Sequence, residues 1–400
     1  MDKRLLVLAL GMFALGTDTF VMAGVLPRIA HEFNVDVAIA GQLTTLYAIA
    51  YALLSPTIAA LAASVPRKQL MVSGLVVFVL ANLATALAPT FGIALASRVF
   101  AGLGAAMYAP TATGTGATMV APEHRGQAIT IIVAGLTAAT ALGSPIGTVI
   151  GGLSDWRWTM YFVSALGLAA GLGIMALLRK LPMPPKVGLR ARLAPLREAR
   201  VGWTLLTTFL GMAGNFVVYI YFSVVFDRVL ANAIVFGALL VVWGTSGTAT
   251  NIVLSRFLDR SSPTRLLLLM LTVQMVAMAT MPWTSAQLWS SFLVVAVWGA
   301  TGWGIQAPQQ YRLVNMAPSI APVLLGLNTA ATYLGVTTAG VLGAVGLHSF
   351  GAHYLGFVSV GVFVLAIFSS QMAARRIADH RAPALSAELR RCAATRPGSA

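Results

Sequence analysis

Residues Leu5–Leu26 read LLVLALGMFALGTDTFVMAGVL, and this stretch decides the fold. An α-helix needs about 20 mostly apolar residues to cross the hydrocarbon core of a bilayer, and this run has that length. Asp18 is its one charged residue. Lys3 and Arg4 precede it, as in a signal peptide, but Asp18 interrupts the run and further apolar runs follow. We therefore expect a retained membrane-spanning helix.

The same pattern recurs along the rest of the chain. Of its 400 residues, 58% are hydrophobic and only 9% are charged, which is too little polar side chain to cover soluble domains. The single cysteine also excludes a disulfide-built secreted domain. We expect an all-α membrane protein with twelve spans, at residues 5–26, 38–62, 70–88, 91–119, 127–150, 156–178, 201–226, 233–257, 265–282, 288–312, 321–347 and 351–374.

The basic residues predict the orientation of these spans. Of 26 Lys and Arg residues, 22 fall on the side that holds both termini, three fall on the opposite side, and Arg98 lies inside a span. The positive-inside rule places both termini in the cytoplasm of a multi-pass protein of the cell inner (plasma) membrane. The formal charge of +15 therefore indicates membrane lipid headgroups as partners and no nucleic acid.

An internal repeat divides the chain. A shift of 196 residues lays Leu5 on Val201 and Met119–Pro122 on Asn315–Pro318. Two six-helix bundles in parallel repeat are typical of transporters with a substrate cavity between the halves. We expect a monomer with four parts: a first bundle at residues 1–178, a basic cytoplasmic linker at 179–200, a second bundle at 201–374 and a disordered basic tail at 375–400.

Two charged residues stand inside the spans, where each costs about 2.5 to 3.5 kcal/mol on insertion scales. At 1.5 Å per residue, Asp18 and Arg98 lie roughly 10 to 12 Å below the outer surface, so they can meet if their helices are neighbours. Separating such a pair changes the proton affinity of the carboxylate, which is the basis of proton coupling. The alternative is a static ion pair that joins the two helices.

Two further groups are candidates for function. Span 127–150 and its end are rich in helix breakers, which indicate tight helix packing or a gate, at Gly143, Pro145, Gly147, Gly151 and Gly152. Polar and aromatic residues within spans could line a cavity for a partly apolar solute, although Tyr and Trp near span ends usually form an interfacial belt. The candidate cavity residues are Tyr108, Asn215, Tyr219, Trp298, Trp303 and Gln306.

The sequence favours neither catalysis nor a cofactor. No metal-ligand spacing occurs among the five histidines, and we expect no metal. A Walker loop and a nucleophile-elbow serine with its partners are also missing, so we expect neither ATP hydrolysis nor an enzyme.

Local motifs add a family resemblance. The run ALGTDTF at Ala14–Phe20, the run SRVFAGLG at Ser97–Gly104 and the run GSPIG at Gly143–Gly147 resemble motifs of the drug:proton antiporter group of the major facilitator superfamily. The chain is similar to this superfamily across nearly its whole length. Shorter matches resemble the branch of chloramphenicol, sugar and purine efflux transporters, at Tyr219–Tyr221, in the stretch from Trp298 to Gln310 and at Asn328.

The resemblance implies the direction of transport and the roles of some residues. It implies proton-coupled export of small drug-like compounds by alternating access, with Asp18 as the coupling carboxylate and Arg98 in the proton relay. It also implies cytoplasmic gate loops, of which the first, Arg67–Lys68, lacks the acidic residue that the second keeps in Asp259–Arg260. The alternatives are efflux of a sugar or nucleobase metabolite, and a sensor or scaffold that transports nothing.

Overall fold

The computed structural model describes residues 3–121, 124–178, 188–257 and 262–394. This part of the chain contains twelve helical segments long and apolar enough to cross a membrane, and it contains no strand. The predicted all-α fold with twelve spans is thereby confirmed. The first six spans are α1 (Lys3–Glu32), α2 with α3 (Val37–Ala40, Gln42–Leu61), α4 (Arg67–Ala86), α5 (Phe91–Thr118), α6 with η3 and α7 (Arg125–Ala138, Ala139–Gly143, Ser144–Leu153), and α8 (Trp156–Leu177).

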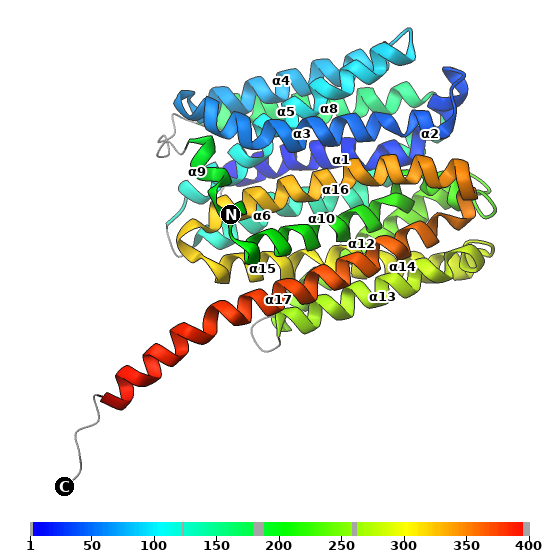
Figure 1. Ribbon diagram of the computed structural model, residues 1–400. Coiled ribbons are helices and arrows are strands. Elements are labelled where there is room, and N and C mark those ends of the chain that lie inside the picture. The colour runs from blue at the N-terminus through cyan, green and yellow to red at the C-terminus, as the bar shows by residue number, and fades with distance from the viewer. Residues whose placement is uncertain (1–2, 122–123, 179–187, 258–261, 395–400) are drawn as a thin grey trace.

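The second half follows the same order. Its spans are α10 with α11 (Ala199–Ile220, Phe222–Val225), α12 (Ala233–Phe257), α13 (Pro263–Thr284), α14 with α15 (Leu288–Gly304, Gln306–Met316), α16 (Ala321–Phe350) and α17 (Leu355–Ala394). The helices run side by side along one direction, with the first half on one side of the bundle and the second half on the other (Figure 1). We name the end that holds α9 (Leu189–Leu193) the linker end, and the opposite end the far end.

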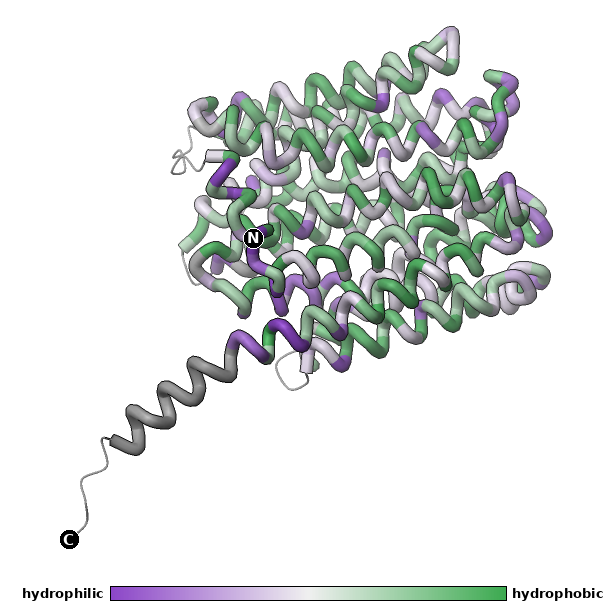
Figure 2. Tube along the Cα trace, in the orientation of Figure 1, coloured by the Kyte–Doolittle hydropathy of each residue, from purple (hydrophilic) through white to green (hydrophobic). Residues whose placement is uncertain are grey.

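The outer surface of the bundle is apolar. Large side chains such as Leu80, Leu172, Leu293 and Phe368 are each more than half exposed. Soluble proteins rarely expose apolar surface on this scale, whereas lipid accepts it. Hydrophilic residues gather at the two ends of the bundle, and hydrophobic ones cover the length between them (Figure 2).

Two spans are interrupted next to a proline. Pro145 cannot donate a backbone hydrogen bond and its ring crowds the carbonyl of Ala141, and the helix takes a π-helical turn, η3, directly before it. Pro308 has the same relation to Gly304, and the tenth span breaks there between α14 and α15. The first interruption lies where the fifth span meets α12 of the second half, and the second lies within the second half.

Each half has its own apolar core, and α1 contributes to both. Leu15, Val21 and Met22 pack in the first-half core. Phe20 and Ala23, on the other face of α1, pack in the core of the second half. The halves also meet along two seams, α3 with α16 and η3–α7 with α12. The fold therefore places Asp18 on a helix that touches both halves.

The structure differs from the expectation for the C-terminal tail. The tail from residue 375 is expected to be disordered, but α17 continues to Ala394. No glycine or proline stands between Gly361 and Pro383, so nothing ends the helix at residue 375, and Ala, Leu and Arg favour its continuation past Pro383. The linker contains the short helices α9 and η4 (Ala194–Arg197), and the Arg192 guanidinium donates to the Ala59 carbonyl oxygen at 3.3 Å. Residues 179–187 of the linker lie outside the described residues.

Candidate functional site

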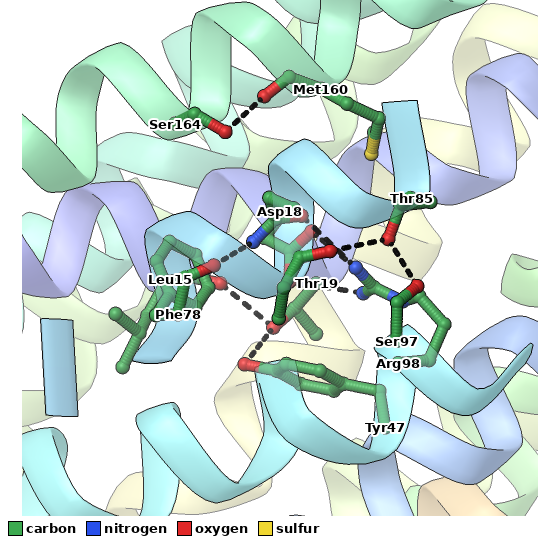
Figure 3. Close-up of polar contacts among 12 residues, drawn as sticks. Leu15, Asp18, Thr19, Tyr47, Phe78, Thr85, Ser97, Arg98, Met160 and Ser164 are labelled. Carbon is green, nitrogen blue, oxygen red and sulfur yellow. Dashed lines mark hydrogen bonds and ion pairs between the residues drawn. The ribbon is translucent and has the colours of Figure 1, made fainter. Parts of the chain in front are cut away.

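The two charged residues inside the spans form an ion pair. Asp18 on α1 and Arg98 on α5 are joined by two parallel hydrogen bonds, from Nη1 to Oδ1 at 2.9 Å and from Nη2 to Oδ2 at 3.0 Å. Neither side chain exposes any surface. The expectation that the two side chains meet is confirmed, and Figure 3 shows them pointing toward each other between their helices.

Two neighbouring helices complete the surroundings of the guanidinium. Arg98 Nη1 also donates to Asn82 Oδ1 on α4 at 3.1 Å, and the amide nitrogen of Asn82 donates to the Phe78 carbonyl oxygen at 3.0 Å. The Arg98 guanidinium lies 5.0 Å from the centre of the Tyr47 ring on α3, within cation–π range. Arg98 Nε has no acceptor. Four helices of the first half thus hold one charged pair.

Sequence reasoning missed Asn82 and Tyr47. Each is a polar residue in the middle of an apolar span, which is the only signal that could have identified them. A second side-chain contact links α4 and α5 beside the pair: the hydroxyl oxygens of Thr85 and Ser97 lie 2.7 Å apart. These contacts fix the rotamer and position of Arg98 from α4 as well as from α1.

The glycine and proline motif brings α7 against both halves. A Cβ added at Gly143 would overlap the Thr17 hydroxyl, next to Asp18, and one added at Gly147 would lie 2.6 Å from Val21. A Cβ at Gly151 would lie 2.7 Å from Val25, whereas one at Gly152 would overlap Ala233 of the second half. Pro145 is buried at the first turn of α7. The motif is therefore a site of close helix packing, and its role as a gate stays a prediction.

Arg28 holds the far end of this motif. Its Nη1 donates to the carbonyl oxygens of Gly151 at 2.6 Å and Ser154 at 2.7 Å, and its Nη2 donates to Gly152. These are carbonyls at the C-terminal end of α7, where a cation complements the helix dipole. This contact joins α1 to α7 and was not predicted.

The predicted cavity residues fall into separate places. Tyr108 lies within the first half, where its hydroxyl donates to the Leu8 carbonyl oxygen at 2.8 Å. Asn215 Oδ1 accepts from Trp298 Nε1 at 2.7 Å and from Gln274 Nε2 at 3.1 Å in the second half. These three predicted residues are buried and paired with protein in this conformation.

Of the remaining three cavity candidates, Tyr219 and Trp303 contact Phe20 of the first half, whereas the hydrogen-bonding contacts of the Gln306 amide stay within the second half. The Tyr219 hydroxyl donates to the Phe20 carbonyl oxygen at 3.0 Å. Trp303 is half-buried, and its indole nitrogen has no acceptor. Gln306 is also half-buried, and its amide nitrogen lies 3.4 Å from Met212 Sδ. Their role as a substrate cavity stays a prediction.

Aromatic rings connect part of this group. Phe20 of α1 lies 5.8 Å from Tyr219, 5.9 Å from Trp243 and 5.7 Å from Trp303, measured between ring centres. Trp243 and Trp298 are 6.0 Å apart. This cluster places an α1 residue two positions from Asp18 among rings of the second half.

The first predicted gate loop binds a helix end. Lys68 Nζ donates to the carbonyl oxygens of Met175 at 2.8 Å and Leu178 at 2.6 Å, at the C-terminal end of α8. Arg67 Nη1 lies 3.4 Å from Thr115 Oγ1. The second predicted gate loop, Asp259–Arg260, lies outside the described residues. Among the residues that are described, no three His, Cys, Asp or Glu side chains gather as a metal site would need.

Comparisons with known proteins agree with this architecture. The family model of the Major Facilitator Superfamily matches residues 8–321. The inner membrane transport protein YdhP of Escherichia coli (strain K12) is 29% identical over 378 residues, covering 92% of this chain and 95% of that protein. A "Probable sugar efflux transporter" of Helicobacter pylori (strain HPAG1) is 25% identical over 366 residues, covering 91% and 93%.

A solved structure shares the fold. The crystal structure of a D-xylose-proton symporter superposes with a TM-score of 0.75 at 15% sequence identity, over 92% of this chain and 96% of that one.

Proposed function

The chain belongs to the Major Facilitator Superfamily as a multi-pass, non-enzymatic transporter, and from this premise we propose that it exports small drug-like organic compounds in exchange for protons. The proposed location is the inner membrane, with both termini in the cytoplasm, because the basic residues gather on that side. A small organic molecule and protons are the proposed substrates, and a monomer is the proposed working unit.

The observation that carries this proposal is the buried pair of Asp18 and Arg98. A buried ion pair is a weak stabiliser, because well-packed apolar residues of similar volume are often no worse. In a transporter the pair has a second use, because movement of the helices can exchange Arg98 for a proton as the partner of the Asp18 carboxylate. Asp18 thus takes up a proton on the outer side and releases it on the inner side.

The contacts between the halves support alternating access. Tyr221, between α10 and α11 at the far end, donates to the carbonyl oxygens of Ala38 at 3.4 Å and Gly340 at 3.0 Å, which ties this junction to α2 and α16. Gly152 and Ala233 also meet at the far end. If the linker end is cytoplasmic, these contacts close the outer side, and their separation exposes the centre to the outside.

Export rests on two supports. The motif of Gly143, Pro145 and Gly147 resembles that of exporters, and a relative carries sugar efflux in its name. That name favours a second candidate, efflux of a sugar, over efflux of a nucleobase. Uptake of labelled solute into proteoliposomes separates either candidate from a sensor or scaffold, which would move none.

The test is driven transport by the Asp18→Asn variant. In a pump-deficient host, we expect the wild type to raise resistance to a subset of a compound panel and the variant to raise none. In everted vesicles, an imposed pH gradient is expected to drive solute accumulation by the wild type only. Asp227→Asn is the matched control, because Asp227 is an exposed carboxylate that pairs with His353. Equal driven transport by Asp18→Asn and the wild type contradicts proton coupling at Asp18.

A further inference from the structure

The charged pair is closed off from solvent in this conformation. Asp18 and Arg98 are fully buried, yet a carboxylate that exchanges protons must be reached from water in some conformation. The inference that follows rests on the proposed function. Among the described residues, the charged and titratable groups around Asp18 come from three helices: Arg98 on α5, Tyr47 on α3 and Tyr333 on α16.

Three tyrosines lead from the pair to the contact between the halves. The Tyr47 ring faces the Arg98 guanidinium, and its hydroxyl lies 3.3 Å from the Thr19 hydroxyl, next to Asp18. Tyr51 follows one turn later on the same face of α3. Its ring lies against Tyr333, with 4.0 Å between ring centres and 34° between ring planes. Tyr47 and Tyr51 are buried, whereas Tyr333 is only half-buried.

Tyr333 belongs to the second half, whereas the charged pair and the other two tyrosines belong to the first. It packs against the apolar cores of both halves. Its helix meets α3 closely, because a Cβ added at Gly340 would overlap the Thr45 hydroxyl. Any rocking of the halves that opens the α3–α16 seam therefore moves Tyr333 away from Tyr51 and leaves the carboxylate less covered.

We propose that Tyr333 is a positioning residue that gates proton access to Asp18: stacked on Tyr51 it keeps the Asp18–Arg98 pair enclosed, and its withdrawal with the second half opens the pair to protons. The device makes proton exchange depend on the conformation of the halves. Without such dependence, protons could cross at Asp18 with no solute moving. The ring acts as the cover, and the phenolic hydroxyl of Tyr333, which interacts with Thr19 next to Asp18, is not required for it.

Carbodiimide labelling tests this gate without knowledge of the solute. Dicyclohexylcarbodiimide reacts with protonated carboxyl groups, so the rate of adduct formation at Asp18 reports both access and protonation. The full-length protein in lipid nanodiscs is labelled at several pH values, and the Asp18 peptide is quantified by mass spectrometry. We expect Tyr333→Ala to label roughly tenfold faster than the wild type, because the enclosed site opens at lower cost. The rate is expected to rise as pH falls.

Three further variants make the result specific. Tyr51→Ala removes the other ring of the stack and is expected to accelerate labelling as Tyr333→Ala does, which also covers the case that one of the two fails to fold. Tyr333→Phe keeps the ring and is expected to label at the wild-type rate. Tyr161→Ala removes a half-buried tyrosine on α8 that makes an edge-to-face contact with Trp158, away from the pair, and is expected to leave the labelling rate unchanged.

The proposed gate is wrong if Tyr333→Ala and Tyr51→Ala fold and Asp18 is labelled in them at the wild-type rate. It is also wrong if Tyr161→Ala accelerates labelling of Asp18 equally. If Asp18 is labelled faster in Tyr333→Phe than in the wild type, the aromatic ring alone does not cover the pair. Labelling requires no pH gradient and no solute, so its outcome is independent of driven transport. If an imposed pH gradient does not change solute transport by the wild type, the proposed proton coupling is wrong. That result leaves the labelling test of Tyr333 as a cover of Asp18 unaffected.

Discussion

At the scale of single residues, the arginine at position 98 matters through its shape as well as its charge. The planar guanidinium binds both carboxylate oxygens of Asp18 and still reaches Asn82 with one of the same nitrogens. A lysine carries the same charge but cannot donate in this fixed fork. Removing one partner leaves a buried charge without compensation, and this is where a buried pair shows its largest effect.

We expect Arg98→Gln to lower the free energy of unfolding by about 3–5 kcal/mol, because the buried Asp18 charge loses its partner. Adding Asp18→Asn in the same chain is expected to recover much of that loss. Denaturation of the purified protein in detergent measures both variants. Arg190→Gln is the control, since Arg190 is an exposed arginine of the linker. Identical unfolding of the single and double variants would show that the two charges are not coupled.

At the scale of elements, the π-helical turn η3 is where the fifth span touches both its own half and the other. Thr17 of α1 lies against Gly143 on one side. On the other side, a Cβ added at Gly244 of α12 would lie 2.5 Å from the carbonyl carbon and oxygen of Thr140. A glycine is needed here because two backbones approach too closely for any side chain between them.

Gly244→Ala is expected to force α12 away from η3, because the atoms it meets are backbone and cannot rotate aside. Overpacking of this kind costs about 1–3 kcal/mol. We expect a lower unfolding temperature and slower solute flux in proteoliposomes. Gly361→Ala on α17 is the matched control, since an added Cβ there meets nothing within 4 Å. If Gly244→Ala is as stable and as active as this control, α12 and η3 are not packed as closely as the structure indicates.

At the scale of the whole molecule, the two halves meet along two seams, α3 with α16 and η3–α7 with α12, and through α1, which packs in the core of the second half. Most of each half packs around its own apolar core, and we expect each half to move as a unit in the proposed cycle. In the proposed cycle, the far-end contacts of Tyr221 and Gly152 hold one side of the bundle closed. Alternating access requires these contacts to break and reform in each cycle.

A reversible cross-link tests that requirement. A Cβ added at Gly237 of α12 lies 2.9 Å from Val149 Cγ2 of α7, so cysteines at both positions are expected near the ~3.5–4.5 Å Cβ separation of a disulfide. In a chain with Cys392→Ser, we expect oxidation of Val149→Cys with Gly237→Cys to stop solute flux and reduction to restore it. Each single cysteine variant serves as control. Complete cross-linking with undiminished flux would contradict rocking at this seam.

Particular residues show how far prediction from the sequence reaches. Asp18 and Arg98 were identified because a charge in an apolar span is rare, and their similar depth predicted that they could meet. Asn82, Tyr47 and Arg28 were missed, because polar residues of these kinds are ordinary in or beside spans. The cavity residues were chosen by type and depth alone, and neither property tells which helix face they occupy.

The sequence by itself determined the twelve spans, the two halves and the two intramembrane charges, because hydropathy and residue type are local properties that need no knowledge of neighbours. Only the tertiary structure decided which faces meet: that Arg98 is shared between Asp18 and Asn82, that Tyr333 of one half covers Tyr51 of the other, and that Asn215 pairs with Trp298. The physical reason is that side-chain packing between distant segments selects these contacts, and the periodicity of one helix cannot encode the face of another.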